Sequence, residues 1–133
     1  MKSNLLLVVT SLLSILLITV HISQDIVLGF AGGGLVNLIA IGILAVYLCG
    51  ALLWSDRRRG LIILLLGSLL AVAMPVLHMT GAGVGVKRTA GAYFFVWTLY
   101  VLGVTGTFGI ILSARALWSA RAARTPPDQR AIS

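Results

Sequence analysis

The sequence predicts an all-α integral membrane protein, a compact antiparallel bundle of four transmembrane helices. Of its 133 residues, 59% are hydrophobic and only 10% are charged, and the mean hydropathy is +1.09. A soluble domain with a solvated surface does not sustain such values. Four apolar runs of spanning or near-spanning length are separated by connections too short for an extramembrane domain. We therefore expect one transmembrane domain over residues 1–125 and a disordered cytoplasmic tail over 126–133.

The first expected span covers about residues 4–24 and carries its polar residues along one line. At about 100° per residue, five polar side chains project within about 60° of one another: Ser3, Thr10, Ser14, His21 and Asp25. His21 and Asp25 are four residues apart, so they are neighbours on the helix surface and the carboxylate can orient the imidazole. This polar face should point into the bundle.

The second expected span, residues 35–54, has Asn37 as its only strongly polar residue and Trp54 at its inner end. Small residues on one face, Gly42, Ala45 and Cys49, predict a surface that packs closely against a neighbouring helix. Cys49 is the single cysteine of the chain, which excludes an intramolecular disulfide and CxxC redox chemistry.

The third expected span, residues 61–78, contains Pro75 near its outer end, where a proline bends the last turn. His78 projects on the same side of an ideal helix as Gly60, Gly67 and Ala71. Small residues favour contact between helices. We therefore expect His78 to face the bundle and not the lipid.

The fourth expected span, residues 92–114, begins with an aromatic cluster that includes Tyr93 and Trp97, which is typical of a membrane interface. Small and hydroxyl side chains deeper in the span predict a packing face: Thr98, Thr105, Gly106, Gly109 and Ser113. A basic juxtamembrane helix to about residue 124 is expected to follow along the anionic inner leaflet.

The net charge of +7 reflects membrane topology and indicates no nucleic-acid partner. If four helices alternate, Lys87 and Arg88 lie on one side of the membrane and the other eight basic residues lie on the opposite side. By the positive-inside rule both termini are cytoplasmic, in a multi-pass protein of the inner membrane. The arginines expected to face the lipid headgroups are Arg57, Arg58, Arg59, Arg115, Arg121 and Arg124.

Several polar and aromatic residues are expected at one depth. Counted from the inner border at about 1.5 Å per residue, His21, Asn37, His78 and Trp97 each lie about 26 Å away. Because the hydrocarbon core is about 30 Å thick, this level is just inside the outer interface. Asp25 and Tyr93 stand about one turn higher. These six residues form the candidate ligand-binding group.

Three kinds of ligand suit this group, and the sequence does not choose among them. His21 and His78 could bind a transition metal or ligate a haem iron from both faces, although these two ligands plus Asp25 are few for a closed structural zinc site. A quinone headgroup could be held by the two histidines with Asn37 and Tyr93, against Trp97 as a flat wall. Alternatively, the residues are polar only because water is near the membrane border.

The leading functional expectation is a non-enzymatic accessory or scaffold subunit, acting with a membrane-protein partner or as a homo-oligomer in the lipid bilayer. The sequence contains no glutamate, no deep carboxylate for ion coupling, no nucleophile beside a base and no cofactor motif. The alternative expectation is a metal-, haem- or quinone-binding membrane protein that uses the His/Asp group near the outer interface.

Overall fold

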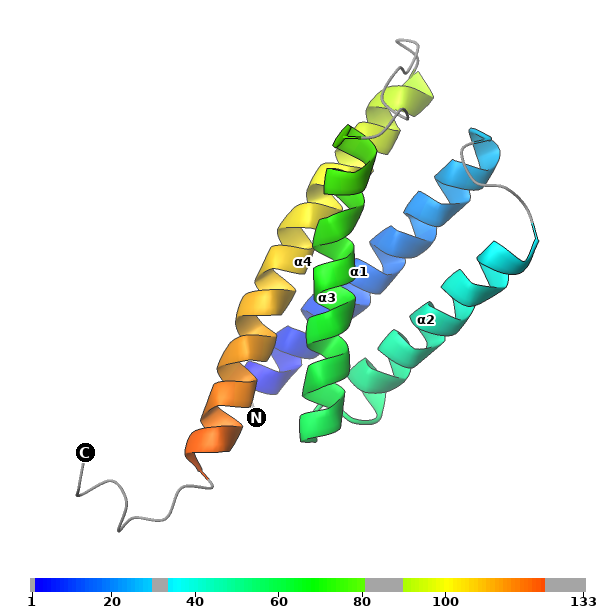
Figure 1. The fold of residues 1–133 in the computed structure, drawn as a ribbon. Helices are drawn as coiled ribbons and strands as arrows, with labels where there is room; N and C mark the ends of the chain where they lie inside the picture. Colours follow the sequence, from blue (N-terminus) through cyan, green and yellow to red (C-terminus); the bar gives the residue numbers. More distant parts are fainter. Residues whose placement is uncertain (1, 30–33, 81–89, 124–133) are drawn as a thin grey trace.

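The four apolar runs form four helices, each antiparallel to the next along the chain (Figure 1). The computed structural model describes residues 2–29, 34–80 and 90–123. The helices are α1 (Lys2–Val27), α2 (Leu35–Leu52), α3 (Arg58–Thr80) and α4 (Ala90–Ala122). The expected tail 126–133 and Arg124 lie outside the described residues, as do Lys87 and Arg88.

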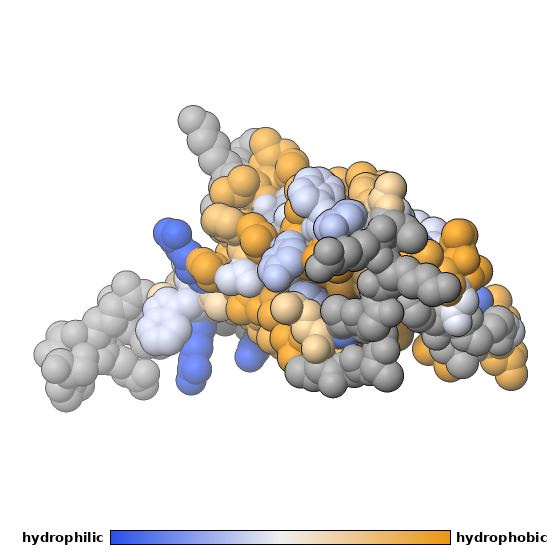
Figure 2. Space-filling view, turned by 90° about the horizontal axis from the view of Figure 1, so that it is seen from above, coloured by the Kyte–Doolittle hydropathy of each residue, from blue (hydrophilic) through white to orange (hydrophobic). Residues whose placement is uncertain are grey.

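Three of these helices are long and apolar enough to cross a membrane: Leu5–Val27, Arg58–Met79 and Ala90–Ala122. The protein is therefore multi-pass. Seen from one end, much of the visible perimeter is hydrophobic, as expected of a surface in contact with lipid (Figure 2).

The remaining helix, α2, is shorter than the expected span 35–54, because the chain turns at Trp54. The Arg57 N–H donates to the Trp54 carbonyl at 2.9 Å, and a Cβ at Gly60 would overlap that carbonyl. Glycine is thus required for the turn, and Trp54 lies outside the helix. The apolar helical stretch that remains is Asn37–Leu52.

α4 presents one buried and one exposed seam, each with residues at intervals of three and four. The buried seam packs against α3 and α1 and consists of Phe95, Leu99, Leu102, Gly106, Gly109 and Ser113. The exposed seam consists of Tyr93, Trp97, Tyr100, Val104, Phe108 and Ile111. The packing face predicted for this span is confirmed. α4 also continues unbroken through Arg115 and Arg121, so the basic segment extends the helix of the fourth span.

Glycines bring α3 and α4 close together. A Cβ at Gly106 would lie 2.9 Å from the Ala71 Cβ and from the Ser68 carbonyl, and a Cβ at Gly109 would overlap Ser68 Oγ. The absence of side chains at these two positions allows the backbones to approach. This is the most extensive helix contact of the described chain.

α2 packs against α3 and α1 through a different face from the one predicted. Gly42 and Ala45 are exposed, so the prediction of a packing face there is wrong. The Tyr47 ring lies instead over Gly67. Ser68 Oγ donates to the Leu64 carbonyl at 2.7 Å, so the Tyr47 hydroxyl donates to Ser68 Oγ at 3.3 Å. This contact combines a large side chain of α2 seated on a glycine of α3 with Gly50 of α2, which lies against Ile63.

The polar side of α1 points inward, as predicted for Ser14 and His21, which are both buried. Thr10 is half-buried, and Ser11, which was not predicted, is buried. The inner seam is Leu7, Ser11, Ser14, Ile18 and His21, at alternating intervals of four and three. α1 therefore presents His21 to the interior formed by α3 and α4.

Candidate metal centre

Two helices bring three titratable side chains together near the C-terminal ends of α1 and α3. His21 and Asp25 come from α1 and His78 comes from α3, and one ligating atom of each lies within 4.8 Å of the others. His21 Nε2 is 3.4 Å from Asp25 Oδ2, and His78 Nε2 is 3.6 Å from Asp25 Oδ1. Both oxygens of one carboxylate thus face an imidazole nitrogen.

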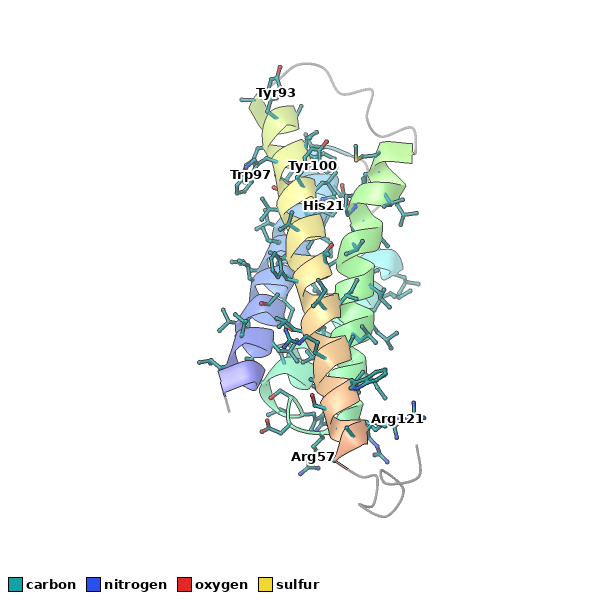
Figure 3. The ribbon with its side chains drawn as sticks, turned by 90° about the vertical axis from the view of Figure 1, so that its left-hand side faces the viewer. His21, Arg57, Tyr93, Trp97, Tyr100 and Arg121 are labelled. Atoms are coloured by element: carbon teal, nitrogen blue, oxygen red, sulfur yellow. The ribbon has the colours of Figure 1, made fainter. Side chains whose placement is uncertain are left out.

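The group is shielded from the surroundings. The His21 side chain is fully buried, and the side chains of Asp25 and His78 are only 16% and 21% exposed. Figure 3 shows His21 within the helices, at the end of the molecule opposite Arg57 and Arg121. The prediction that His78 faces the bundle is confirmed, despite Pro75 in the preceding turn.

A backbone contact determines which nitrogen of His78 carries hydrogen. His78 Nδ1 lies 2.9 Å from the Met74 carbonyl oxygen, which can only accept, so Nδ1 donates. In the neutral ring, Nε2 then carries a lone pair directed toward Asp25 Oδ1. Two lone pairs that face each other repel unless a cation lies between them. A proton on Nε2 or a metal ion supplies that positive charge.

Phe95 of α4 closes one side of the group and was not among the predicted site residues. Its ring centroid is 5.1 Å from that of His21 and 5.6 Å from that of His78. The two imidazoles lie 4.6 Å apart and nearly perpendicular. The signal for Phe95 was present in the sequence, because it lies eleven residues, close to three turns, before Gly106 on the same side of the helix.

The structure brings together three of the six predicted candidates. Tyr93 and Trp97 are 67% and 59% exposed on the outer seam of α4, so they lie on the side of that helix that faces away from the group. Asn37 is half-buried in α2, and in the described part of the chain no hydrogen bond joins its side chain to the histidines. The arginines Arg57, Arg58, Arg59, Arg115 and Arg121 are exposed, and Arg124 lies outside the described residues.

Buried polar atoms of the group lack hydrogen-bond partners. Within the described ranges this holds for both ring nitrogens of His21 and for Asp25 Oδ1. Burying a polar atom without a partner costs free energy, so native proteins rarely tolerate several in one place. Of these atoms, His21 Nε2 and Asp25 Oδ1 lie on the side where the three residues meet, as expected of ligands to an ion.

The donor set and its spacing suit a divalent transition metal. Metal–ligand bonds of about 2.0–2.2 Å place neighbouring donors about 2.8–3.1 Å apart around an octahedral ion and about 3.3–3.6 Å apart around a tetrahedral ion. The nitrogen–oxygen distances of 3.4 and 3.6 Å are close to the tetrahedral range. The hydrogen bond from His78 Nδ1 to a carbonyl is the usual means by which a ligating histidine is oriented.

Comparison with known proteins finds no matching family model, no similar curated protein and no similar solved structure.

Proposed function

We propose that this chain is a small multi-pass protein of the inner membrane that binds a divalent transition-metal ion near the outer surface through His21, Asp25 and His78. The observation that carries the proposal is the shared carboxylate, whose two oxygens lie 3.4 and 3.6 Å from the Nε2 atoms of two histidines on different helices.

The ligand types favour one class of metal. Two imidazoles and one carboxylate suit Zn²⁺, Fe²⁺, Co²⁺ or Ni²⁺, whereas Mg²⁺ and Ca²⁺ prefer sites made only of oxygens. Three protein ligands leave at least one coordination position for water or another small ligand, which is typical of sites where the metal reacts or exchanges and not of closed structural sites. The proposed role is therefore metal binding and not metal-dependent folding.

Four membrane crossings are consistent with this site. Because His21 and His78 are in contact, α1 and α3 end on the same side, and α2 has to return the chain across the bilayer between them. The basic residues at the opposite end of the molecule make that end cytoplasmic. Both termini are then cytoplasmic, and the His/Asp group lies toward the outer surface.

The other ligands considered from the sequence are less compatible with this geometry. Imidazoles whose centroids are 4.6 Å apart and in edge-to-face contact leave no space for a porphyrin between them. A quinone site that includes Tyr93 and Trp97 requires side chains that point away from the histidines. The competing proposal is the non-enzymatic accessory or scaffold subunit, in which the same three residues hold no ion.

Metal content of the purified full-length protein tests the proposal. A purification tag without histidines avoids added metal sites, and Co²⁺ serves as a spectroscopic probe of the ligands. We expect about one metal ion per chain in the wild type. Asp25→Asn and His78→Gln should each lower Co²⁺ affinity by more than the roughly 10- to 100-fold cost of losing an outer-shell partner.

Asp56→Asn is the matched control, because it removes an exposed carboxylate at the other end of α3. Its affinity for Co²⁺ should equal that of the wild type. A wild-type protein that contains no metal and leaves the Co²⁺ spectrum unchanged contradicts the proposal and favours the scaffold subunit. Binding that survives in both Asp25→Asn and His78→Gln also contradicts it, because the metal then lies elsewhere.

A further inference from the structure

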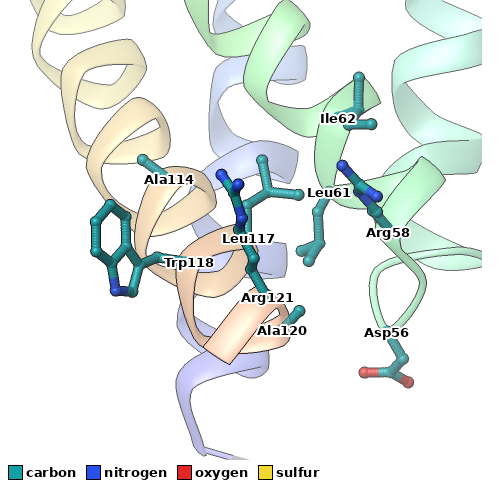
Figure 4. Close-up of a pocket in the computed structure, with 9 residues that line it drawn as sticks. All are labelled: Asp56, Arg58, Leu61, Ile62, Ala114, Leu117, Trp118, Ala120 and Arg121. Atoms are coloured by element: carbon teal, nitrogen blue, oxygen red, sulfur yellow. The ribbon is translucent and has the colours of Figure 1, made fainter. Parts of the chain in front are cut away.

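A second site lies at the other end of the molecule, in a cleft of about 640 Å³ between the first turns of α3 and the last turns of α4. Figure 4 shows Arg58 of α3 and Arg121 of α4 on opposite sides of this cleft, with Leu61 and Leu117 between them. None of these residues belongs to the His/Asp group. The cleft therefore needs an explanation of its own.

The charge of the cleft favours an anion. Both guanidinium-bearing side chains are exposed, and a third charged residue, Asp56, lines the cleft beside them. Two arginines against one aspartate leave a net positive charge. A guanidinium presents planar, paired donors that match phosphate oxygens, and two of them on separate helices can bind one phosphate from two sides.

The rest of the lining is apolar, which favours a lipid over a soluble anion. Ile62 is 41% exposed and Trp118 is 78% exposed, and both line the cleft with Leu61 and Leu117. A tryptophan in this position is typical of a membrane interface. A bound acyl chain covers these surfaces, whereas free phosphate leaves them uncovered.

We propose that this cleft binds one anionic phospholipid, with the headgroup phosphate between Arg58 and Arg121 and its two acyl chains against the apolar lining, one beside Ile62 and the other beside Trp118 (Figure 4). The site goes beyond the metal proposal and shares no residue with it. If the chain is oriented as proposed above, this lipid belongs to the inner leaflet of the membrane. No other part of the lipid proposal depends on that orientation. Scattered basic residues attract anionic lipid without order, whereas Arg58 and Arg121 come from two different helices and line one cleft.

Native mass spectrometry of the full-length protein with phosphatidylglycerol or phosphatidylcholine tests the proposal. We expect one retained phosphatidylglycerol per chain, retained more strongly than phosphatidylcholine. Since each charge-assisted hydrogen bond contributes a factor of about tenfold or more, Arg58→Gln with Arg121→Gln should lower phosphatidylglycerol affinity at least about 100-fold. Arg59→Gln with Arg115→Gln is the matched control, because it also removes one exposed arginine from each of α3 and α4, and neither of these two lines the cleft. Its affinity should fall by no more than about 25-fold, which is the loss expected when two charges near an anionic lipid surface are removed.

Three results would overturn the lipid site. Equal losses in the two double variants indicate unspecific attraction, and equal retention of phosphatidylcholine indicates no headgroup recognition. Equal affinity for glycerol 3-phosphate indicates a site for soluble anions. Crosslinking of wild-type protein with a photoreactive phosphatidylglycerol gives a test without variants, and labels should map to residues 58–62 and 114–121. Metal content measured on the same variants should be unchanged, so the two proposals succeed or fail separately.

Discussion

At the scale of single residues, the site depends on which way each side chain points around its helix axis. Phe95 and Trp97 are two positions apart in the aromatic cluster, yet Phe95 is 1% exposed and Trp97 is 59% exposed. Phe95 lies against both imidazoles, and Trp97 stacks with Phe94 on the outer surface. Only the first of these aromatics can hold the histidine rings in place.

Exchanging each aromatic for leucine separates the two roles. Phe95→Leu removes the flat surface beside His21 and His78, so we expect a changed Co²⁺ spectrum and a metal affinity lower by up to about 10-fold. Trp97→Leu should leave both unchanged. Cobalt titration followed by absorbance measures this, and equal effects of the two substitutions would show that Phe95 has no special position.

At the scale of helices, the contact between α3 and α4 holds the group in register. His78 is carried by α3 and Phe95 by α4, and the two helices approach where Gly106 and Gly109 face Ser68 and Ala71. Interior packing leaves little free space for added atoms. A shift of one helix relative to the other therefore moves Phe95 away from the imidazoles.

Adding a methyl group at these glycines should weaken the bundle. Gly106→Ala and Gly109→Ala force α3 and α4 apart, and we expect each to lower the free energy of unfolding by about 1–3 kcal/mol. Gly42→Ala is the control, because nothing lies within 4 Å of its added Cβ, and it should be neutral or stabilise by up to about 1 kcal/mol. Unfolding in bilayers, followed by steric trapping, measures the difference. A Gly109→Ala protein as stable as Gly42→Ala would refute this account of the contact.

At the scale of the whole molecule, the two proposed sites occupy opposite ends of the bundle. The His/Asp group lies near the C-terminal ends of α1 and α3, and the arginine cleft lies between the beginning of α3 and the end of α4. The side of the membrane on which the metal is bound therefore depends on the orientation of the chain.

Labelling of single cysteines checks that orientation. The background for both variants is Cys49→Ser, and the cells are intact spheroplasts, in which the outer face of the inner membrane is open to reagents. Gly91→Cys should react there with a maleimide that does not cross membranes, because Gly91 is exposed at the start of α4. Asp56→Cys, in the exposed turn before α3, should react only after lysis. The reverse pattern would place the metal group on the cytoplasmic side.

Sequence reasoning predicted the parts of the fold that follow from helical periodicity. The line of polar residues on α1 identified the inward direction of His21, and the small residues of the third span identified that of His78. The predicted depth level included Asn37 and Trp97 because counting along a helix gives height and not rotation. The direction of Trp97 could have been read by extending the seam from Gly106 upward through Leu102 and Leu99.

The face of α2 could not be predicted from its own residues. Gly42 and Ala45 are small but exposed, whereas Tyr47 is large and buried because Gly67 of α3 leaves space for its ring. Such a contact requires that a large side chain on one helix lies opposite a space on another helix. The spacing of residues within either helix does not show which residues of the two helices lie opposite each other. For the same reason the contact of Phe95 with two histidines emerges only from the three-dimensional arrangement.

The short second helix has a consequence for the bilayer itself. At about 1.5 Å per residue, the 18 residues of α2 extend about 27 Å, whereas α4 extends about 38 Å from Ala90 to the residue before Arg115. α2 packs against α3 and α1 but not against α4 in the described chain. The short α2 and the long α4 therefore contact lipid on different sides of the bundle. Lipids beside α2 have to thin to match it, at a cost of a fraction of a kcal/mol per Å. Where α2 crosses the bilayer, this hydrophobic mismatch gives the protein a thin flank beside α2 and a thicker flank beside α4.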